Sequence, residues 1–369
     1  MAQTALLLDA FDPLPAKAGH YVPVMQDKSG EREALTQLAG HAWSRVTPVF
    51  CFIGDKAPST PMTDSRVLAW SKRAQDVFAG HVFYVDFVRQ DPSMDVSDGR
   101  STWTLVDRGY QRLRKRKLAF VPVFRDGWTK AVAHYVATAH DMDGRGAALR
   151  IRLDNTIASS LPLAQRITKA VTALDLAPEC LDLMLDLGYL DCEGEPDLDG
   201  VVAGLKTASS AADWRNLIVC ATTMPSSLTK GVVPGGTVGS LPRHERSIYA
   251  QAAGGIAGKA VTYGDYLVQN PEPPVDTGGP SFRPNIRYTI ADQTLVARGN
   301  RPYTEVGNQD YPTLCAQLAA HPGYAGADFS WGDAQLALCA QGLLEPGGQN
   351  MWRGVGSSHH IAQVLAELS

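Results

Sequence analysis

The sequence has no apolar run that approaches the roughly 18 residues needed to cross a bilayer, and its first residues lack the basic region and cleavage site of a secretion signal. We therefore expect no membrane segment. The six cysteines are scattered without a CxxC pair, which argues against a zinc ribbon, a thioredoxin-type motif and a disulfide framework. We expect free thiols in a reducing compartment, so the predicted location is the cytoplasm.

The sequence also lacks a large excess of charge of either sign. Its 34 Lys and Arg residues stand against 38 Asp and Glu, a net charge of −4, so a broad basic surface for nucleic acid is not expected. The single basic cluster, "QRLRKRK" at residues 111–117, fits either the cationic end of a helix or a contact with a polyanion. No GxGxxG follows the first strand-like run and no P-loop is present, which removes the two commonest nucleotide-binding motifs.

What the sequence does have is a regular alternation of β-rich runs and runs with helical periodicity. Eight β-rich runs are each followed by a helical one; they lie at residues 20–26, 46–54, 81–90, 118–127, 148–154, 179–190, 214–223 and 260–268. Alternation with connections of this length implies right-handed crossovers and a parallel sheet. Eight such units predict an α/β protein with a closed (β/α)8 barrel of the TIM type, formed by residues 1–369 as a single domain.

The alternation breaks after the eighth strand. A Pro- and Gly-rich stretch leads into "IRYTIADQTLVARG" at residues 286–299, which predicts a short β-hairpin around Ala291 and Asp292. Helical runs follow at 311–320 and 333–342, and "SSHHIAQVLAELS" at 357–369 predicts the eighth helix of the barrel. Residues 269–356 are then a large insertion between strand 8 and helix 8, which we expect over the C-terminal mouth.

The stretch "ALRIRLD" at residues 148–154 alternates apolar and charged residues without a break. In a barrel the apolar set must face the helices, so the charged set, Arg150, Arg152 and Asp154, must point inward. The next strand has a leucine row that leaves Asp182 and Asp186 inside. Buried charges must pair or hold a ligand. The set is either an ion-pair network for stability alone or part of a site; we expect Arg150 to be structural and Arg152 to be available.

Residues at the ends of strands have the better claim on chemistry, because barrel active sites lie there. As acid–base candidates we take Asp86, Asp186 and Asp265, together with His359 and His360. "WRGVGSSHHI" predicts a glycine loop running into a Ser-capped helix N-terminus that can bind an anion through Gly356, Ser357 and Ser358. The alternative is a plain helix cap with one of the two histidines packed under the insertion.

Three further candidates lie in the predicted insertion. Arg287, Tyr288 and Arg298 are either a clamp for an anionic ligand or pairs that fasten the insertion down. We list them, with Arg152 and Asp154, as phosphate-binding candidates. Metal signatures are poor: there is no HExxH, and although the aspartates could hold Mg²⁺ or Mn²⁺, nothing in their spacing requires it. We therefore assign no metal ligand and leave the cofactor open.

Several segments of the sequence resemble the beta protein family, which occurs in bacteria, phages and prophages. They are "HYVPVMQDKSGEREAL", "VTPVF", "YGDYLV", "IRYTIADQTLVARG" and "SSHHI", and the resemblance covers nearly the whole chain. The family distribution implies a role in phage–host conflict, either antiviral defence or a phage counter-function. Many members carry a glutamate at the end of the second strand, where this chain has Cys51.

Two hypotheses follow. In the first, the barrel mouth binds or hydrolyses a phosphate-bearing ligand, such as a nucleotide, another anionic small molecule or a nucleic-acid end, and a hydrolase would be a phosphodiesterase or nucleotide hydrolase. In the second, the barrel is a non-catalytic sensor or adaptor that binds a phage or host protein in a defence system. Convergent charges at the mouth favour the first, and Cys51 together with the lack of a complete catalytic motif favours the second.

Overall fold

The computed structural model describes residues 19–53, 62–88, 91–153, 161–228, 232–256, 259–272 and 282–369. Eight parallel strands close into a barrel in the order β1, β12, β10, β9, β8, β7, β4, β2. The strands are β1 (Tyr21–Met25), β2 (Val49–Ile53), β4 (Val82–Val88), β7 (Ala119–Arg125), β8 (Ala147–Arg152), β9 (Leu181–Tyr189), β10 (Asn216–Thr222) and β12 (Val261–Asp265). Seven of them lie within the predicted runs, and β8 begins one residue before its run. The predicted (β/α)8 barrel is therefore confirmed.

One long helix follows each barrel strand. In chain order these helices are α1 (Ser29–Thr36), α3 (Asp64–Phe78), α4 (Leu105–Lys115), α5 (Lys130–Asp143), α6 (Leu163–Leu174), α7 (Leu198–Ser210), α8 (His244–Gly255) and α12 (Gln349–Glu367). A short α2 (Gly40–Trp43), a 3-10 turn (Pro178–Cys180) and a small sheet of β3 (Met62–Thr63), β5 (Asp95–Ser97) and β6 (Thr102–Thr104) lie in the connections. Within the described residues, no helix has the length and apolarity to cross a membrane.

Helix α5 and helix α6 illustrate why these segments fold as they do. The Thr129 side chain accepts a hydrogen bond from the Val132 amide at the start of α5, and Gly144 ends the helix in the left-handed conformation (φ 68°), which glycine adopts without strain. In α6, Ile167, Ala170 and Leu174 are buried, and their spacing forms one apolar stripe against the barrel.

The two faces of the barrel strands have different contents. Leu149 and Ile151 pack outward with the leucines of β9 in a cluster shared with the helices. The inner cluster holds small and medium side chains that fill the barrel, among them Val49, Val121, Val123, Ala148, Met184 and Ile218. Arg152 lies beside Asp186 in the parallel register of β8 and β9. Arg150 and Arg152 are thus inside, as predicted, whereas Asp154 falls outside the described residues.

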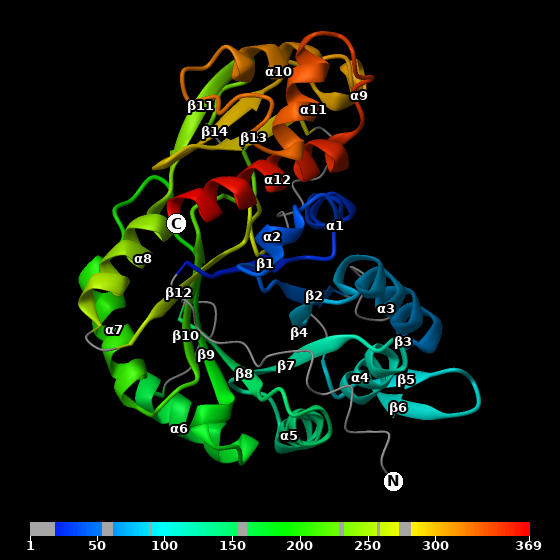
Figure 1. Ribbon diagram of the computed structural model, residues 1–369, viewed down its shortest axis with the longest axis vertical. Helices are drawn as coiled ribbons and strands as arrows, with labels where there is room; N and C mark the ends of the chain where they lie inside the picture. The colour runs from blue at the N-terminus through cyan, green and yellow to red at the C-terminus, as the bar shows by residue number, and fades with distance from the viewer. Residues whose placement is uncertain are drawn as a thin grey trace.

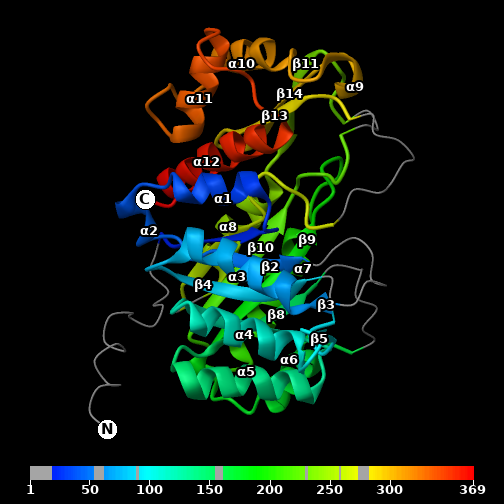
Figure 2. The same ribbon diagram turned by 90° about the vertical axis from the view of Figure 1, so that its right-hand side faces the viewer.

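The insertion builds a second sheet and its own core. Strand β11 (Thr237–Pro242), from the β10–α8 connection, pairs with β14 (Gln293–Arg298), and β14 forms the expected antiparallel hairpin with β13 (Asn285–Thr289). Helices α9 (Tyr303–Val306), α10 (Tyr311–Ala319) and α11 (Trp331–Ala340) cover it. Figures 1 and 2 show this unit at one end of the long axis, with α12 lying between it and the barrel. The unit therefore packs on α12.

The predicted start of the last helix is wrong. Helix α12 begins at Gln349, so Gly354, Gly356, Ser357 and Ser358 lie within it and are buried. The glycines serve close packing. An added Cβ on Gly356 would lie 2.6 Å from the Arg287 carbonyl oxygen, and one on Gly354 would lie 2.9 Å from the carbonyl oxygen of Gly30 in α1. Because these two α12 positions are glycines, β13 on one side and α1 on the other can come close to the backbone of α12.

This close packing makes Gly30 a sensitive position. A Cβ at Gly30 would lie 2.1 Å from the Asn350 carbonyl oxygen, so Gly30→Ala must push α1 and α12 apart. We expect a loss of about 1–3 kcal/mol in the free energy of unfolding, the usual cost of overpacking, measured by urea denaturation. The control is Gly40→Ala, where an added Cβ meets nothing within 4 Å; equal effects of the two substitutions would contradict the packing argument.

Candidate functional site

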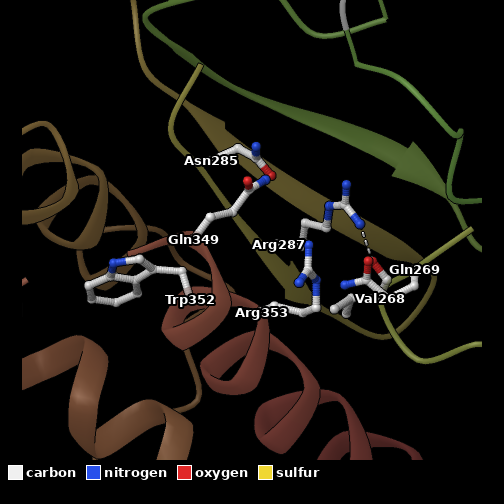
Figure 3. Close-up of a pocket in the computed structure, with 7 residues that line it drawn as sticks. All are labelled: Val268, Gln269, Asn285, Arg287, Gln349, Trp352 and Arg353. Carbon is white, nitrogen blue, oxygen red and sulfur yellow. Dashed lines mark hydrogen bonds between the residues drawn. The ribbon is translucent and has the colours of Figure 1, made fainter. Parts of the chain in front are cut away.

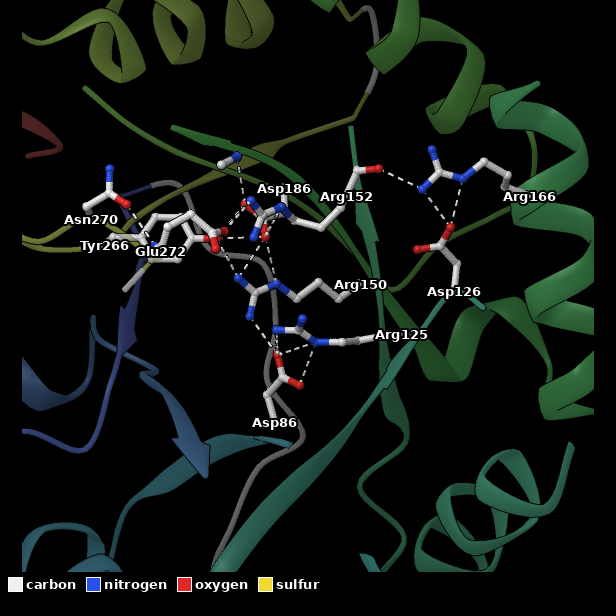
Figure 4. Close-up of polar contacts among 11 residues, drawn as sticks. Asp86, Arg125, Asp126, Arg150, Arg152, Arg166, Asp186, Tyr266, Asn270 and Glu272 are labelled. Atoms are coloured by element: carbon white, nitrogen blue, oxygen red, sulfur yellow. Dashed lines mark hydrogen bonds and ion pairs between the residues drawn. The ribbon is translucent and has the colours of Figure 1, made fainter. Parts of the chain in front are cut away.

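The candidate site is a cluster of charged side chains at the C-terminal ends of four adjacent barrel strands. Asp86 comes from β4, Arg125 from β7, Arg150 and Arg152 from β8 and Asp186 from β9. These residues continue the inward-facing set of each strand, because side chains alternate between the two faces. Figure 4 shows the guanidinium groups converging on the two aspartates.

Arg150 is the centre of the cluster. Its Nη1 donates to Asp86 Oδ2 at 2.6 Å, while Nε and Nη2 donate to Asp186 Oδ2 at 3.0 and 2.8 Å. Nη2 also lies 2.6 Å from the hydroxyl of Tyr266, and that hydroxyl donates to Asp186. The side chain of Arg150 is only 2% exposed. It is therefore a buried ion bridge between two strands, as predicted.

The other two arginines lie nearer the solvent. Arg125 donates through Nε and Nη2 to Asp86 at 2.9 and 2.8 Å, and within the described part of the chain no acceptor is bonded to its Nη1. Arg152 lies 3.5 Å from Asp186 through Nε and 3.1 Å from Glu272 through Nη2. The Glu272 side chain is 48% exposed, against 11% for Arg152 and 19% for Arg125.

The electrostatics keep both aspartates ionised. Burial by itself raises the pKa of Asp86, but Arg125 and Arg150 outweigh it and hold that pKa below its usual value. Burial likewise opposes ionisation of Asp186, and Arg150 and Arg152 lower its pKa overall. Three guanidinium groups thus share two buried carboxylates, and among the described residues the exposed Glu272 adds a third negative charge beside them.

A cavity of about 140 Å³ opens beside this cluster. The three arginines and Tyr266 line it together with Gln26, Cys51 and aliphatic side chains, and Glu272 lies at its rim. Burial and the nearby Asp86 raise the pKa of the Cys51 thiol to about 12, so the thiol is protonated at neutral pH and is a poor nucleophile. Burial raises the pKa of Tyr266 well above its usual value, so its hydroxyl remains a hydrogen-bond donor.

A second layer of charge lies at the opposite end of the barrel and borders no part of this cavity. Asp182 accepts hydrogen bonds from Tyr84 at 2.8 Å, from Arg215 at 2.6 Å and from Asn216 at 2.6 Å. All the carboxylate oxygens are thus used within the protein, so we assign this layer to stability.

Asp265 does not join the mouth, although it ends the eighth strand. Its Oδ2 lies 2.7 Å from His360 Nε2 and its Oδ1 accepts a 2.5 Å hydrogen bond from Tyr21, on the face of β12 that meets α12. The other nitrogen of His360 lies 2.7 Å from Thr289 Oγ1 in β13. These four side chains are at most 2% exposed, so in the described structure Asp265 and His360 tie α12 to the barrel and to the hairpin.

His359 makes the same kind of tie one position earlier. Its Nδ1 lies 2.9 Å from Asp333 Oδ2 and its Nε2 lies 2.6 Å from the Thr289 carbonyl oxygen. Tyr288 stacks on the imidazole at 3.7 Å between ring centres and donates to Asp333. The expectation that the two histidines act at the mouth is therefore wrong: His359 packs under the insertion, and His360 joins the outer face of β12 to the hairpin.

The remaining predicted anion ligands are also placed elsewhere. Ser358 accepts a hydrogen bond from the Gly332 amide, and Ser357 and Gly356 are buried within α12, so they form no helix N-terminus. Arg298 donates to the Val233 carbonyl oxygen at 2.5 Å and ties the insertion to the β10–α8 connection. Arg287 lies in β13 and donates to the Val268 carbonyl oxygen, outside the mouth cavity.

Three residues of the mouth are missing from the sequence-based list: Arg125, Tyr266 and Glu272. The signal for Arg125 is present in "LAFVPVFRDG", where alternation puts Val121, Val123 and Arg125 on one face. Tyr266 follows β12 directly, and the alternation that packs Tyr263 outward points Tyr266 inward. Glu272 lies in a connection that carries no periodic pattern, so nothing in the sequence places it.

The fold and the cluster define a class: a (β/α)8 barrel with a charged, arginine-rich mouth. The chain belongs to the Beta protein family, whose model matches residues 21–366. The family segments meet around one network, since Tyr21, Asp265, Thr289 and His360 come from four of the five motifs named above. A search of curated proteins found no match.

Solved structures with a related fold include type I 3-dehydroquinate dehydratase from Clostridium difficile, with 10% identity, a TM-score of 0.41, and coverage of 71% of this chain and 88% of that one. Triosephosphate isomerase from Bartonella henselae has 9% identity, a TM-score of 0.34, and coverage of 68% and 94%. The barrel assignment itself rests on the closed strand order. Across the described residues, no three His, Cys, Asp or Glu side chains gather as metal ligands.

Removing the central arginine tests the ion bridge. Arg150→Met keeps much of the volume but leaves Asp86 and Asp186 buried with less compensation, so we expect a loss of about 3–5 kcal/mol in unfolding free energy. The control is Arg114→Met, which removes a partly exposed pair with Asp143 and should cost about 1 kcal/mol or less. Similar losses in the two variants, measured by urea denaturation, would contradict a special role for Arg150.

Acid stability tests the same charges by another route. The pKa values of Asp86 and Asp186 are lowered in the folded state, in spite of burial, by the neighbouring arginines, and the pKa of Asp265 is lowered by its contacts with His360, Tyr21 and the Leu267 amide. The unfolded chain therefore binds more protons, and the stability these groups provide is present above their unfolded pKa of about 4 and is lost as the pH falls below it. We expect the urea midpoint to drop steeply between about pH 4 and pH 2. A midpoint that stays flat across this range would contradict the assignment.

Proposed function

We propose that the barrel mouth recognises a phosphate-bearing ligand, such as the phosphate end of a nucleotide or nucleic acid. The observation that carries the proposal is the Nη1 atom of Arg125, which no described acceptor occupies, beside a cavity that three guanidinium groups line. Arginine is the residue best suited to phosphate, because its planar fork donates two parallel hydrogen bonds.

The buried aspartates prepare the arginines for this task. Asp86 fixes the guanidinium of Arg125, and Asp186 contacts both Arg150 and Arg152, so little side-chain entropy remains to be lost on binding. The cavity of about 140 Å³ is smaller than the roughly 300 Å³ and more of drug-sized pockets. It therefore suits the anionic end of a larger molecule rather than the whole.

The same geometry favours recognition over hydrolysis. A general base must have a pKa near the working pH and reach the reacting atom. Behind the arginines that line the cavity, Asp86 and Asp186 are held in ion pairs with lowered pKa values. In the lining itself, the Cys51 thiol has a pKa of about 12 and Glu272 is paired with Arg152. His359 and His360 lie beyond the barrel wall. We therefore favour a sensor that binds the ligand without cleaving it.

For the biological setting we propose phage–host conflict in the cytoplasm, with antiviral defence as the role. This rests on what the family resemblance implies. Such a sensor would detect a nucleotide, or a nucleic acid with a phosphate end, whose concentration changes during infection. A phage or host protein would then be the partner to which the bound state is signalled.

The test is a titration of the full chain with orthophosphate, pyrophosphate, a nucleoside triphosphate, and one oligonucleotide prepared with a 5′-phosphate or a 5′-hydroxyl. Arg125→Gln should weaken binding by about 10- to 100-fold, because a hydrogen bond to a charged group is worth about 1.5–3 kcal/mol. The matched control is Arg114→Gln, which alters a partly exposed arginine paired with Asp143 outside the cavity lining and should bind as the parent does.

Three outcomes would overturn the proposal. Equal affinity for the 5′-phosphate and 5′-hydroxyl oligonucleotides would remove phosphate as the recognised group. Binding unchanged by Arg125→Gln would move the site away from the mouth. Turnover of the bound ligand that Arg125→Gln abolishes would replace the sensor with the hydrolase.

A further inference from the structure

A second arginine pair lies outside the mouth, in the seam between the insertion and the barrel. Arg287 of β13 and Arg353 of α12 line one small cavity together with Val268, Gln269 and Asn285. Figure 3 shows the two guanidinium groups side by side, with the amides of Asn285 and Gln349 facing each other next to them. No part of this cavity is shared with the lining of the mouth.

Some N–H groups of the two arginines have no hydrogen-bond acceptor among the described residues. Arg287 donates through Nη1 to the Val268 carbonyl oxygen, and Arg353 donates through Nη1 to Asn350 Oδ1 at 2.6 Å. The Nε atoms of both are buried and bonded to nothing in the described parts of the chain. A buried donor without an acceptor costs free energy, and more so when it carries charge.

The local charge is unbalanced as well. Burial and the charge of Arg353 lower the pKa of Arg287 to about 10, with no acidic group among the causes. Glu31 favours the charged form of Arg353. Its Oε2 accepts from the backbone amides of Gln26 and Lys28, and its buried Oε1 has no hydrogen bond to either arginine or to any other described group. Two cations and one acid therefore share this seam.

The rest of the lining is also suited to an anion. Helix α12 starts at the cavity with 19 residues and with Gly348 as an N-cap that offers no side-chain acceptor. The Met351 amide donates to the Gly348 carbonyl oxygen, but the positive end of the helix dipole lies at this seam. The amide group of Asn285 lies at the same cavity. The cavity volume of about 20 Å³ admits a single water-sized atom.

We propose that Arg287 and Arg353 bind a monatomic inorganic anion of chloride size in this seam, where it neutralises the pair and ties the insertion to α12 and to the segment after β12. The site is separate from the proposed phosphate site in the mouth. It explains why two arginines are packed together with two buried Nε donors unmatched, since the anion supplies the missing acceptor.

Thermal unfolding of the full chain in potassium chloride, bromide, phosphate or gluconate at one ionic strength tests the proposal. The parent should melt at least ~2 °C higher in chloride and bromide than in gluconate, because a ligand that binds only the folded state stabilises it. Arg353→Gln should lose this shift. Arg301→Gln, a 59% exposed arginine of the same unit, should keep it and thus reports the general salt effect. Arg125→Gln should also keep it, which separates this site from the mouth.

Equal melting temperatures of the parent in chloride and gluconate would overturn the proposal, as would a shift that survives Arg353→Gln. A shift that depends on Arg353 but appears in phosphate and not in chloride would replace the halide with an oxyanion and overturn the assignment of the ion. The direct observation is a bromide anomalous peak between the two guanidinium groups in a crystal of the parent. A bromide-soaked crystal with no such peak would contradict the site.

Discussion

Arg150 is the interaction on which the rest of the barrel mouth depends. One buried guanidinium group holds Asp86 of β4 and Asp186 of β9 across the barrel interior. Each carboxylate has two oxygens with about four acceptor sites, so a second arginine can also bond to it from the solvent side. Arg125 and Arg152 occupy these places. The buried bridge therefore contributes less by its own stability than by positioning two outer arginines toward the cavity.

A second set of polar contacts performs a different task outside the barrel. His359 and His360 contact Thr289 of the hairpin through its carbonyl oxygen and its hydroxyl, and each also pairs with an aspartate. One end of α12 thereby covers the barrel while the other enters the core of the insertion. The family motifs meet at this contact, and their polar side chains hold α12 against the barrel and the hairpin. Tyr266, the residue after Asp265, points instead into the mouth.

Much of the fold could be predicted from the spacing of apolar residues alone. Strands and helices repeat their apolar side chains with different periods, and each barrel strand must bury one apolar face against the helices. The inward position of Arg150 followed from the same rule. The start of α12 was missed because Gly354 and Gly356 resemble a loop by propensity, whereas tertiary packing against Gly30 and Arg287 requires them. Asp265 was assigned to the mouth because it ends a strand, but the end of a strand does not by itself decide which face a side chain lies on. The signal was Tyr263, which is two residues earlier, packs outward and therefore places Asp265 on the outer face.

The central claim is that the mouth binds phosphate through prepositioned arginines. The most direct measurement is a crystal structure of the parent protein grown with a 5′-phosphorylated ligand. The account predicts tetrahedral density within hydrogen-bonding distance of Arg125 Nη1 and of Arg152, with Arg150 still bridging Asp86 and Asp186 and with Glu272 moved away from Arg152. Phosphate density elsewhere on the protein, with Glu272 still on Arg152 and only water beside Arg125, would contradict it.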